Sequence, residues 1–360
     1  MAMKAWVLHG IGDIRYEDAE VPMLNPEEVR IKVKAVGICG SDIPRIYKTG
    51  AHRMPLIPGH EFSGVVDGVG KKTSPYWIGK RVGVYPLIPC GKCKPCEAGH
   101  PEMCRDYSYT GSRRDGAFAE YVSVPSCNLI ELPANVSFEA AAMLEPMAVA
   151  AHAMQRGIGD GVNPNVRIVV CGLGTIGLLM VMLLKERGFQ NIYVIGNKES
   201  QRERVMGLGV PGESFCNSSS DNVARWMQDT FGGADIYFEC VGKSECNSYG
   251  IDGAAPGARL AFIGNPYSDM RLSKDTYWKI LRNQLTITGS WNSTFQQQGN
   301  DDLVADDWHY VVKRLESGKI KPESLITHRM SLKELDKGFV IMRDKVQEYC
   351  KIMMVNPDPV

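Results

Sequence analysis

The most informative stretch of this sequence is VRIVVCGLGTIGLLMVMLLKERG, residues 166–188. An apolar strand, VRIVV, leads into a glycine-rich turn, and an apolar helical segment follows the turn. A lone GxGxxG pattern is weak evidence, but between a strand and a helix it indicates a dinucleotide-binding turn. Gly172 permits the tight turn, Gly174 lets the backbone approach a pyrophosphate, and Gly177 allows the helix to pack closely on the sheet. The helix start, Thr175 and Ile176, offers free N–H groups to the phosphates.

Apolar strands and amphipathic helices alternate around this stretch. Further strands are predicted at 191–197, 234–242, 258–264 and 285–291, and helices at 199–209 and 220–232. Near-continuous apolar strands that alternate with helices are typical of a doubly wound parallel sheet.

Short strands broken by Gly and Pro fill the first 130 residues instead, at 28–38, 61–70, 80–88 and 118–124. A helix is predicted at 137–157, and the tail adds a helix at 306–319 and a strand at 349–355. The predicted fold class is therefore α/β plus β, with a compact β domain beside a parallel-sheet domain.

The length of the chain and its balanced charge indicate how many domains and which kinds of partner to expect. A chain of 360 residues suggests about two domains. Lys plus Arg and Asp plus Glu both total 41, so nothing in the charge favours nucleic acid or an anionic membrane as a partner. The longest apolar run, IGLLMVMLL, is shorter than the ~18–20 residues of a membrane span. The start, MAMKAWVLHGIGD, lacks the long apolar centre of a signal peptide, and a cytoplasmic location is the default prediction.

Four of the eleven cysteines cluster in CGKCKPCEAGHPEMC: Cys90, Cys93, Cys96 and Cys104. The C-x2-C-x2-C-x7-C spacing lets four thiolates reach one ion, and four thiolates around zinc form a closed, structural site. Free surface thiols are one alternative. An iron–sulfur cluster is another, although ferredoxin runs have a shorter last gap and a Pro after the last Cys.

A second set of possible ligands is dispersed along the chain. Cys39 lies in GICGSD, His60 and Glu61 lie in PGHEFSG, and Glu145 lies in MLEPMAV. A thiolate, an imidazole and a carboxylate, with one position left for water or substrate, would make a catalytic zinc site. A lone His beside Gly is more often structural, so the prediction depends on the set.

Six motifs in order carry a family resemblance: GICGSD, GHEFSG, the four-cysteine segment, DGAFAEY, LEPMAVAAHA and GLGTIG. The chain resembles the zinc-dependent medium-chain alcohol and polyol dehydrogenases over nearly its whole length. The resemblance implies a GroES-like catalytic domain, 1–148 and 288–360, with a structural zinc lobe at about 89–106. It also implies an inserted Rossmann nucleotide-binding domain at 149–287, two zinc ions per subunit, and a homodimer or homotetramer.

The resemblance assigns roles residue by residue. Cys39, His60 and Glu61 match the family's catalytic-zinc positions, and Glu145 matches a glutamate that binds the metal directly or through water in the sorbitol dehydrogenase-like branch. Ser41 matches the hydroxyl residue beside the alcohol. Pro44 departs from the family pattern, since many members place a proton-relaying histidine there; His52 or water would then carry the proton.

The second predicted strand of the nucleotide domain ends without the acid that binds the adenosine ribose of NAD. Gly196 occupies that position, Asn197 follows as a hydrogen-bond donor, and Lys198 and Arg202 bring positive charge. A missing carboxylate removes the repulsion of a 2′-phosphate. We therefore predict that NADP is favoured over NAD; the alternative is that the cations form a solvated helix face and NAD binds adequately.

Within the family, the segments 39–52, 110–121 and 278–292 most resemble galactitol-1-phosphate 5-dehydrogenases and their sugar-alcohol relatives. A hydride would pass from a secondary alcohol to the nicotinamide and leave a ketone. The alternatives are unphosphorylated polyols, sugar acids such as galactonate or idonate, and threonine; a zinc-bearing nucleotide sensor without turnover is an alternative of another class. Candidate substrate contacts are Arg45, His52, Arg113, Arg114, Trp291 and Asn292, because a guanidinium can grip phosphate or carboxylate.

Overall fold

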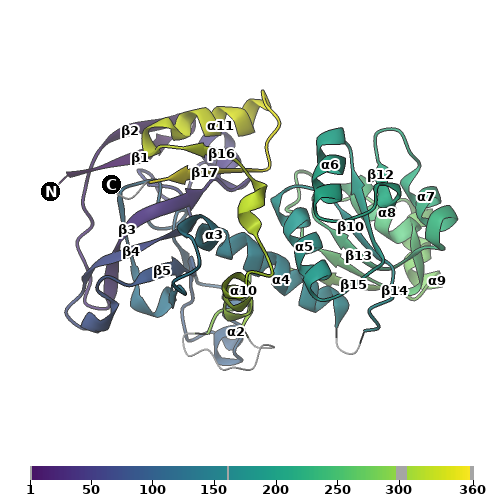
Figure 1. Cartoon of the computed structure of the whole chain (residues 1–360), viewed down its shortest axis with the longest axis horizontal. Helices are drawn as coiled ribbons and strands as arrows, with labels where there is room; N and C mark the ends of the chain where they lie inside the picture. The colour runs from purple at the N-terminus through teal and green to yellow at the C-terminus, as the bar shows by residue number, and fades with distance from the viewer. Residues whose placement is uncertain (1, 160–161, 297–305, 357–360) are drawn as a thin grey trace. The chain divides into compact units, whose positions relative to one another are not determined.

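The computed structural model describes residues 2–159, 162–296 and 306–356 (Figure 1). The chain forms two compact units, one of Met1–Ala148 with Thr294–Val360 and one of Val149–Ser293. The second boundary lies after the strand at 286–289 rather than at the predicted 287, because that strand pairs within the parallel sheet. Among the described residues, no helix is both long and apolar enough to cross a membrane.

The inserted unit is built on a six-stranded parallel sheet. Its strand order is β12-β11-β10-β13-β14-β15. Numbered from the first strand of the unit, this order is 3-2-1-4-5-6, which defines the doubly wound dinucleotide-binding fold. The strands are β10 (Ile168–Cys171), β11 (Ile192–Gly196), β12 (Phe215–Asn217), β13 (Ala234–Glu239), β14 (Ala254–Phe262) and β15 (Thr286–Gly289).

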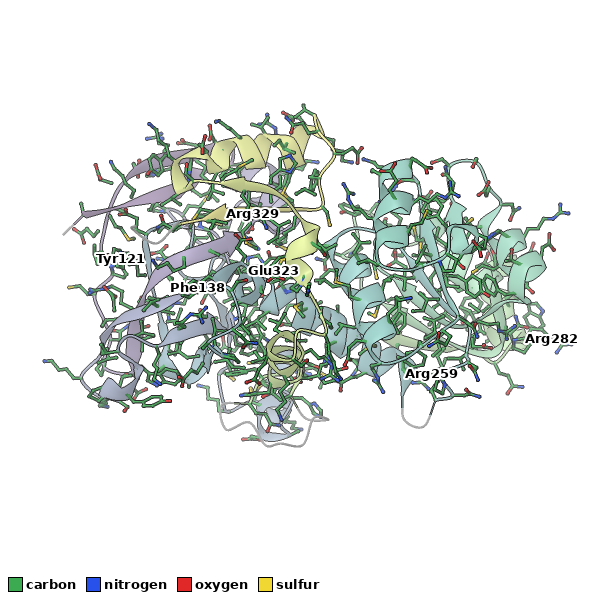
Figure 2. All side chains as sticks on the ribbon, viewed as in Figure 1. Tyr121, Phe138, Arg259, Arg282, Glu323 and Arg329 are labelled. Carbon is green, nitrogen blue, oxygen red and sulfur yellow. The ribbon has the colours of Figure 1, made fainter. Side chains whose placement is uncertain are left out.

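After β10, the described residues of this unit form the helices α5 (Thr175–Glu186), α6 (Glu199–Gly207), α7 (Val223–Phe231), α8 (Ser244–Asp252) and α9 (Lys274–Arg282). The sequence patterns predicted the first three and missed α8 and α9. Capping explains where α7 lies, since the Asn222 side chain accepts from Arg225 N and Gly232 ends the helix in the left-handed conformation. Arg259 of β14, which is labelled in Figure 2, donates its Nε to Gly157 O at 2.9 Å. Gly157 belongs to α4 (Leu144–Ile158), so this bond joins the end of α4 to the sheet.

The other unit contains a seven-stranded sheet in the order β16-β17-β3-β4-β5-β9, with β8 also paired to β3. Its strands are β3 (Glu28–Gly37), β4 (Glu61–Val69), β5 (Arg81–Val84), β8 (Tyr121–Pro125), β9 (Leu129–Glu131), β16 (Ile326–Met330) and β17 (Lys351–Val355). Two smaller sheets pair β1 (Ala2–Gly10) with β2 (Asp13–Glu20) and β6 (Leu87–Ile88) with β7 (Ser108–Tyr109). The predicted strand 80–88 is thus two strands in different sheets, and Pro86, which has no N–H to donate, lies between them.

Helices of this unit are α1 (Asp42–Pro44), α2 (Lys94–Glu97), α3 (Phe138–Ala142), α10 (Asp307–Glu316) and α11 (Leu335–Asp344), and α4 (Leu144–Ile158) begins in it. The helix predicted at 137–157 is two helices. Pro146 explains the break, because its ring is tolerated only in the first turn of a helix. Glu145 therefore lies in the first turn of α4, where a helix stabilises negative charge.

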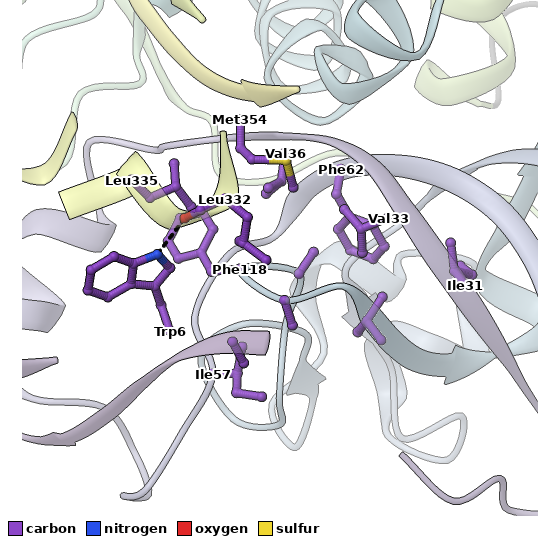
Figure 3. Close-up of a cluster of buried hydrophobic side chains, with 14 of the residues drawn as sticks. Trp6, Ile31, Val33, Val36, Ile57, Phe62, Phe118, Leu332, Leu335 and Met354 are labelled. Carbon is purple, nitrogen blue, oxygen red and sulfur yellow. Dashed lines mark hydrogen bonds between the residues drawn. The ribbon is translucent and has the colours of Figure 1, made fainter. Parts of the chain in front are cut away.

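Both ends of the chain build the core of this unit. Trp6, near the N-terminus, donates its indole Nε1 to the carbonyl of Leu332 at 2.7 Å (Figure 3). Buried side chains from β3, β4, α11 and β17 surround this contact in one continuous hydrophobic cluster. Two polar ties join the C-terminal segment to α3: Arg329 pairs with Glu139 at 2.7 Å, and Ser137 Oγ donates to Glu323 at 3.0 Å (Figure 2).

Candidate active site

Three predicted metal ligands converge at one end of β3 and β4. Gly37 pairs with Glu61 across the antiparallel strands, so Cys39, just beyond β3, faces the start of β4. Ligand atoms of Cys39, His60 and Glu61 all lie within 4.8 Å of one another. His60 and Glu61 are buried, and Cys39 is partly buried. A thiolate, an imidazole and a carboxylate at this spacing can hold one zinc ion.

Asp42 contacts two of these candidate ligands, Cys39 and His60. Its side chain is fully buried and accepts a hydrogen bond from Cys39 N at 3.0 Å and one from Arg45 Nη1 at 2.5 Å. Its Oδ1 lies 3.5 Å from Nδ1 of His60. Burial opposes ionisation of both groups, yet the facing charges prevail: the pKa of Asp42 is lowered, and the pKa of His60 is raised well above its usual range. Asp42 therefore fixes the loop that carries Cys39 and places a negative charge beside the imidazole of His60.

Glu61 is also held by a cation from the far end of the chain. Lys351, the first residue of β17, forms an ion pair with Glu61 Oε2 and donates to Ile38 O at 3.2 Å. Both side chains are almost fully buried, with 2% and 3% of their surface exposed. A Cβ at Gly37 would lie 2.6 Å from both Glu61 Oε2 and Lys351 Cε, so only glycine leaves room for this pair.

Glu145 lies beside the three convergent ligands but is not one of them. Its Oε1 accepts a hydrogen bond from the Tyr109 hydroxyl at 3.1 Å, and the Tyr109 ring lies 5.7 Å from the ring of His60. Burial, together with the nearby Glu61, raises the pKa of Glu145 to about 7, although His60 acts in the opposite direction. Tyr109 thus orients a carboxyl group that can change its ionisation near neutral pH.

Ser41 lies beside a candidate metal ligand, whereas His52 is exposed. The hydroxyl of Ser41 donates to the sulfur of Cys39 at 3.3 Å, as expected for a group next to the metal ligands. Pro44 ends the short helix α1, which leaves no titratable side chain at that position. His52 is exposed, and its pKa is lowered by partial burial and by the positive charges of Arg113 and Arg45.

The four-cysteine segment folds into a small lobe around α2. Sulfur atoms of Cys90, Cys93, Cys96 and Cys104 lie within 4.8 Å of one another, and Cys93 Sγ is 3.4 Å from Cys96 Sγ and 3.8 Å from Cys104 Sγ. A tetrahedron with zinc–sulfur bonds of about 2.3 Å has sulfur–sulfur edges of about 3.8 Å, which these distances approach.

Backbone N–H groups lower the pKa of Cys93 to about 6, whereas burial and neighbouring thiols raise the pKa of Cys96 to about 12. A cation is therefore needed to hold all four sulfurs as thiolates, and this donor set fits structural zinc.

The glycine turn has the geometry that its sequence predicts. Gly172 directly follows β10 and has a φ of 94°, in the left-handed region that favours glycine. No atom lies within 4 Å of a Cβ built on Gly174, which leaves this N-cap of α5 open to a ligand. A Cβ at Gly177 would lie 1.8 Å from Gly172 O. The first turn of α5, with Thr175 and Ile176, thus presents free N–H groups beside an open backbone.

The end of β11 carries no acid. Gly196 lies against Gln201, whose Oε1 would be 2.7 Å from a Cβ at 196 and accepts from Asn197 N at 2.9 Å. Lys198 is the N-cap residue of α6, and Arg202 on that helix pairs with Glu199 at 3.3 Å on the exposed surface. A cavity of about 240 Å³ beside them is lined by Glu199, Arg202, Gly212, Phe215, Asn217 and Asp221.

The predicted substrate contacts differ in their burial and in whether they already have a charged partner. Arg45 pairs with the buried Asp42, and Arg114 pairs with Glu28 at 2.7 Å, so both guanidinium groups already have carboxylate partners. Arg113 packs over the Tyr107 ring at 4.5 Å. Trp291 is half-exposed and Asn292 is buried with φ of 62°; both belong to the inserted unit.

These sites define a class of protein: a GroES-like unit with a candidate catalytic metal set and a four-thiolate lobe, and a Rossmann unit with a nucleotide turn. The profile of the alcohol dehydrogenase GroES-like domain matches residues 25–134, and that of the zinc-binding dehydrogenases matches residues 175–311. The chain is 33% identical over 333 residues to galactitol 1-phosphate 5-dehydrogenase of Escherichia coli K12, which covers 91% of this chain and 93% of that enzyme. The chain belongs to the zinc-dependent medium-chain alcohol and polyol dehydrogenases, as its motifs predicted.

Solved structures agree with this assignment. The Escherichia coli galactitol-1-phosphate dehydrogenase superposes with a TM-score of 0.89 at 31% identity and covers 98% of this chain and 100% of that one. The alcohol dehydrogenase RspB from Escherichia coli CFT073, complexed with NADH, gives 0.87 at 27% identity and covers 99% of both chains. A zinc-binding dehydrogenase from Sinorhizobium meliloti bound to NADP gives 0.86 at 25% identity, covering 99% and 100%. Both nicotinamide cofactors thus occur among proteins of this fold.

Sequence reasoning missed three residues of the site. Asp42 is part of the quoted motif GICGSD, and its position three residues after Cys39 was an available signal. Tyr109 lies just before the quoted segment 110–121. Lys351 lies at the other end of the chain, and nothing in its local sequence connects it with Glu61.

Proposed function

We propose that this dehydrogenase transfers a hydride between a secondary alcohol of a polyol, sugar alcohol or polyol phosphate and NAD(P), with the ketone as product. The observation that carries the proposal is the convergence of the Cys39, His60 and Glu61 ligand atoms within 4.8 Å. When bound there, zinc supplies a Lewis acid that polarises the alcohol oxygen. The four-cysteine lobe holds a second, structural zinc ion.

The side chains around the metal set have separate tasks. Cys39 and His60 are ligands, and the third ligand is Glu61 or Glu145. The ion pair with Lys351 competes for one oxygen of Glu61, whereas Tyr109 occupies only one lone pair of Glu145. This difference favours Glu145 as a ligand, direct or through water, when the substrate is absent.

Ser41 is the first acceptor for the alcohol proton. Its hydroxyl already donates to Cys39 Sγ at 3.3 Å, so the lone pairs of its oxygen are available to accept. With Pro44 in the position where many family members have histidine, water or His52 carries the proton onward. A substitution Ser41→Ala lowers kcat with little change in metal content if this assignment holds.

The nucleotide binds on the turn Gly172–Gly177, with Gly174 open to the pyrophosphate. We propose that NADP is preferred over NAD, on the support of Gly196 in place of an acid and of Lys198 and Arg202 next to it. Comparing kcat/KM for the two cofactors tests the preference; one of about tenfold or more for NAD contradicts it.

Gly196→Asp provides the matched variant, and Gly196→Ala is its control, since any side chain at 196 meets Gln201. Asp, but not Ala, should shift the preference toward NAD because its carboxylate repels the 2′-phosphate.

The proposed substrate is most similar to galactitol 1-phosphate, which the name of the 33%-identical relative contains. An unphosphorylated polyol, a sugar acid such as galactonate or idonate, or threonine is the alternative. The test follows nicotinamide reduction with a panel of these alcohols, with and without a metal chelator. Absence of turnover with every secondary alcohol, despite bound zinc and nucleotide, contradicts the proposal and favours a nucleotide-sensing role.

Two further parts of the proposal concern the protein in the cell. A homodimer or homotetramer is proposed by analogy with the family, and sedimentation at several concentrations measures the state. A cytoplasmic location stays a prediction, for which fractionation of the source cells is the check.

A further inference from the structure

Arg113 differs from Arg45, Arg53 and Arg114, because each of those three arginines pairs with a carboxylate of the protein. Arg45 pairs with Asp42, Arg53 with Asp115 at 2.9 Å, and Arg114 with Glu28. Across the described parts of the chain, no carboxylate pairs with Arg113. Its Nε is buried and lacks a hydrogen-bond partner among the described residues, and its guanidinium lies over the ring of Tyr107 at 4.5 Å. A half-buried cation that meets only a ring face retains unused hydrogen-bond donors.

Aromatic rings connect Arg113 to the metal set. The Tyr107 ring lies 6.2 Å from the Tyr109 ring, and Tyr109 contacts both His60 and Glu145. The cation is thus two aromatic side chains away from the candidate ligands.

A second path leads to the same place through charged groups. His52 lies close enough to Arg113 and Arg45 for both charges to lower its pKa, and Arg45 is bonded to Asp42 beside His60. Both series of contacts end at His60. The positively charged Arg113 and Arg45, with His52, therefore lie in the same folded unit as the candidate metal ligands.

The charges of this neighbourhood favour an anion beside Arg113. Arginine stays protonated in proteins, and its planar group binds phosphate or carboxylate through two parallel hydrogen bonds. Arg113 lines an open groove of about 530 Å³, which is also lined by Glu20, Glu28 and Asp115 and by Arg53 and Arg114. Asp115 and Glu28 neutralise Arg53 and Arg114, so that Arg113 keeps its positive charge without a paired carboxylate among the described residues.

We propose that Arg113, with the His52 side chain next to it, binds a terminal oxyanion of the substrate, so that the enzyme acts on anionic polyols in preference to neutral ones. The inference rests on the proposed function, in which the alcohol is oxidised at the Cys39–His60 set. It assigns the anion to Arg113 and excludes Arg45 and Arg114, whose donors hold carboxylates of the protein. A phosphate monoester and a carboxylate share the required chemistry.

The experiment compares galactitol 1-phosphate, L-galactonate and galactitol as substrates of the zinc-loaded enzyme. The measured quantity is the ratio of kcat/KM for each anionic substrate to kcat/KM for galactitol. We expect a ratio above one for the phosphate, the carboxylate or both, and which of the two is favoured identifies the anion. Arg113→Gln should lower the favoured ratio about 10- to 100-fold, as for the loss of a charge-assisted pair of hydrogen bonds.

Arg53→Gln is the matched control. It removes a nearby positive charge whose side chain is half-exposed and paired with Asp115, and it should leave the ratio as in the unaltered enzyme. An equal fall in both variants, or no fall in Arg113→Gln, overturns the assignment. Arg113→Lys keeps the charge but not the fork, and a partial recovery of the ratio supports bidentate recognition.

Calorimetric binding of galactitol 1-phosphate and inorganic phosphate gives a readout that does not need turnover. Weaker binding to Arg113→Gln, with binding to Arg53→Gln unchanged, supports the anion site. Oxidation of galactitol in preference to both anions overturns the inference and leaves the proposed function intact. Absence of oxidation of every alcohol contradicts the proposed function itself and therefore the inference with it.

Discussion

Replacing Lys351 with Met should destabilise the catalytic unit strongly, because it leaves Glu61 buried and unpaired. Both side chains are nearly inaccessible, with 2% and 3% exposed, and Lys351 also holds the carbonyl of Ile38 at 3.2 Å. Removing one partner of such a buried pair typically costs about 3–5 kcal/mol. The exposed pair of Lys337 with Glu334, at 2.8 Å, is a matched control for which Lys→Met should cost less than about 1 kcal/mol.

Hydrogen exchange of the backbone amides in β3, β4 and β17 is the suitable assay, because it reports the opening of this unit separately from the nucleotide unit. Global unfolding of a two-domain chain would mix the two transitions. In chelator-treated protein, exchange in these strands should accelerate about 150- to 4,000-fold in Lys351→Met. Peptides of the parallel sheet, β10 to β15, should be unaffected.

The double variant Lys351→Met/Glu61→Gln tests the cause. Without the carboxylate charge, the buried site has no ion to compensate, and much of the lost protection should return. Exchange in Lys351→Met that matches the Lys337→Met control would refute the reasoning. A double variant no better than Lys351→Met alone would show instead that the lost lysine stem, and not the unpaired charge, causes the effect.

Three further outcomes follow from the geometry. Gly177→Ala should abolish nucleotide binding, measured by titration of intrinsic fluorescence, because its Cβ would lie 1.8 Å from Gly172 O; Gly207→Ala, which meets no atom within 4 Å, is the control. Cys93→Ser should reduce the zinc content by one ion per chain and make the lobe sensitive to protease, while zinc at the catalytic set remains, as elemental analysis would show. Zinc affinity should rise with pH through about 7, since the buried Glu145 must lose its proton to accept a cation, and should rise further above it because His60, whose pKa is also raised, must become neutral; Glu145→Gln should remove the part of the rise near pH 7 in chelator competition, and an unchanged slope there would count against the assignment.

The fold was largely predictable because its signals are local. Continuous apolar strands, each followed by a helix, predicted the parallel sheet, and the glycine turn marked its first strand. The sequence pattern did not predict α8, because its sequence SECNSYGID has little apolar periodicity. The position of this helix comes from packing on the sheet. The single helix expected at 137–157 was wrong because its alanine-rich composition favours a continuous helix, whereas Pro146 is tolerated only in the first turn of a new one.

The candidate metal ligands could be proposed from the sequence because each lies in a short motif, whereas the groups that contact them were harder to infer. Asp42 lies inside such a motif, GICGSD, so its place beside Cys39 could have been inferred. Lys351 could not be inferred from its surroundings, YCKIMMV, which predict only a strand. Its role depends on β17 pairing with β3, a contact between residues more than 300 positions apart. Long-range pairing of this kind leaves no trace in local periodicity.

This pairing makes the candidate metal site and the fold of its unit depend on each other. β17 lies between β16 and β3, and its antiparallel register places Met353 opposite Gly37, two residues before Cys39. The same strand brings Lys351 to Glu61, so the last strand of the chain completes both the sheet and the charge balance of the ligand set. Loss of β17 would expose the edge of β3 and leave Glu61 buried without its cation. The candidate metal ligands and the sheet of this unit therefore share the contact between β17 and β3.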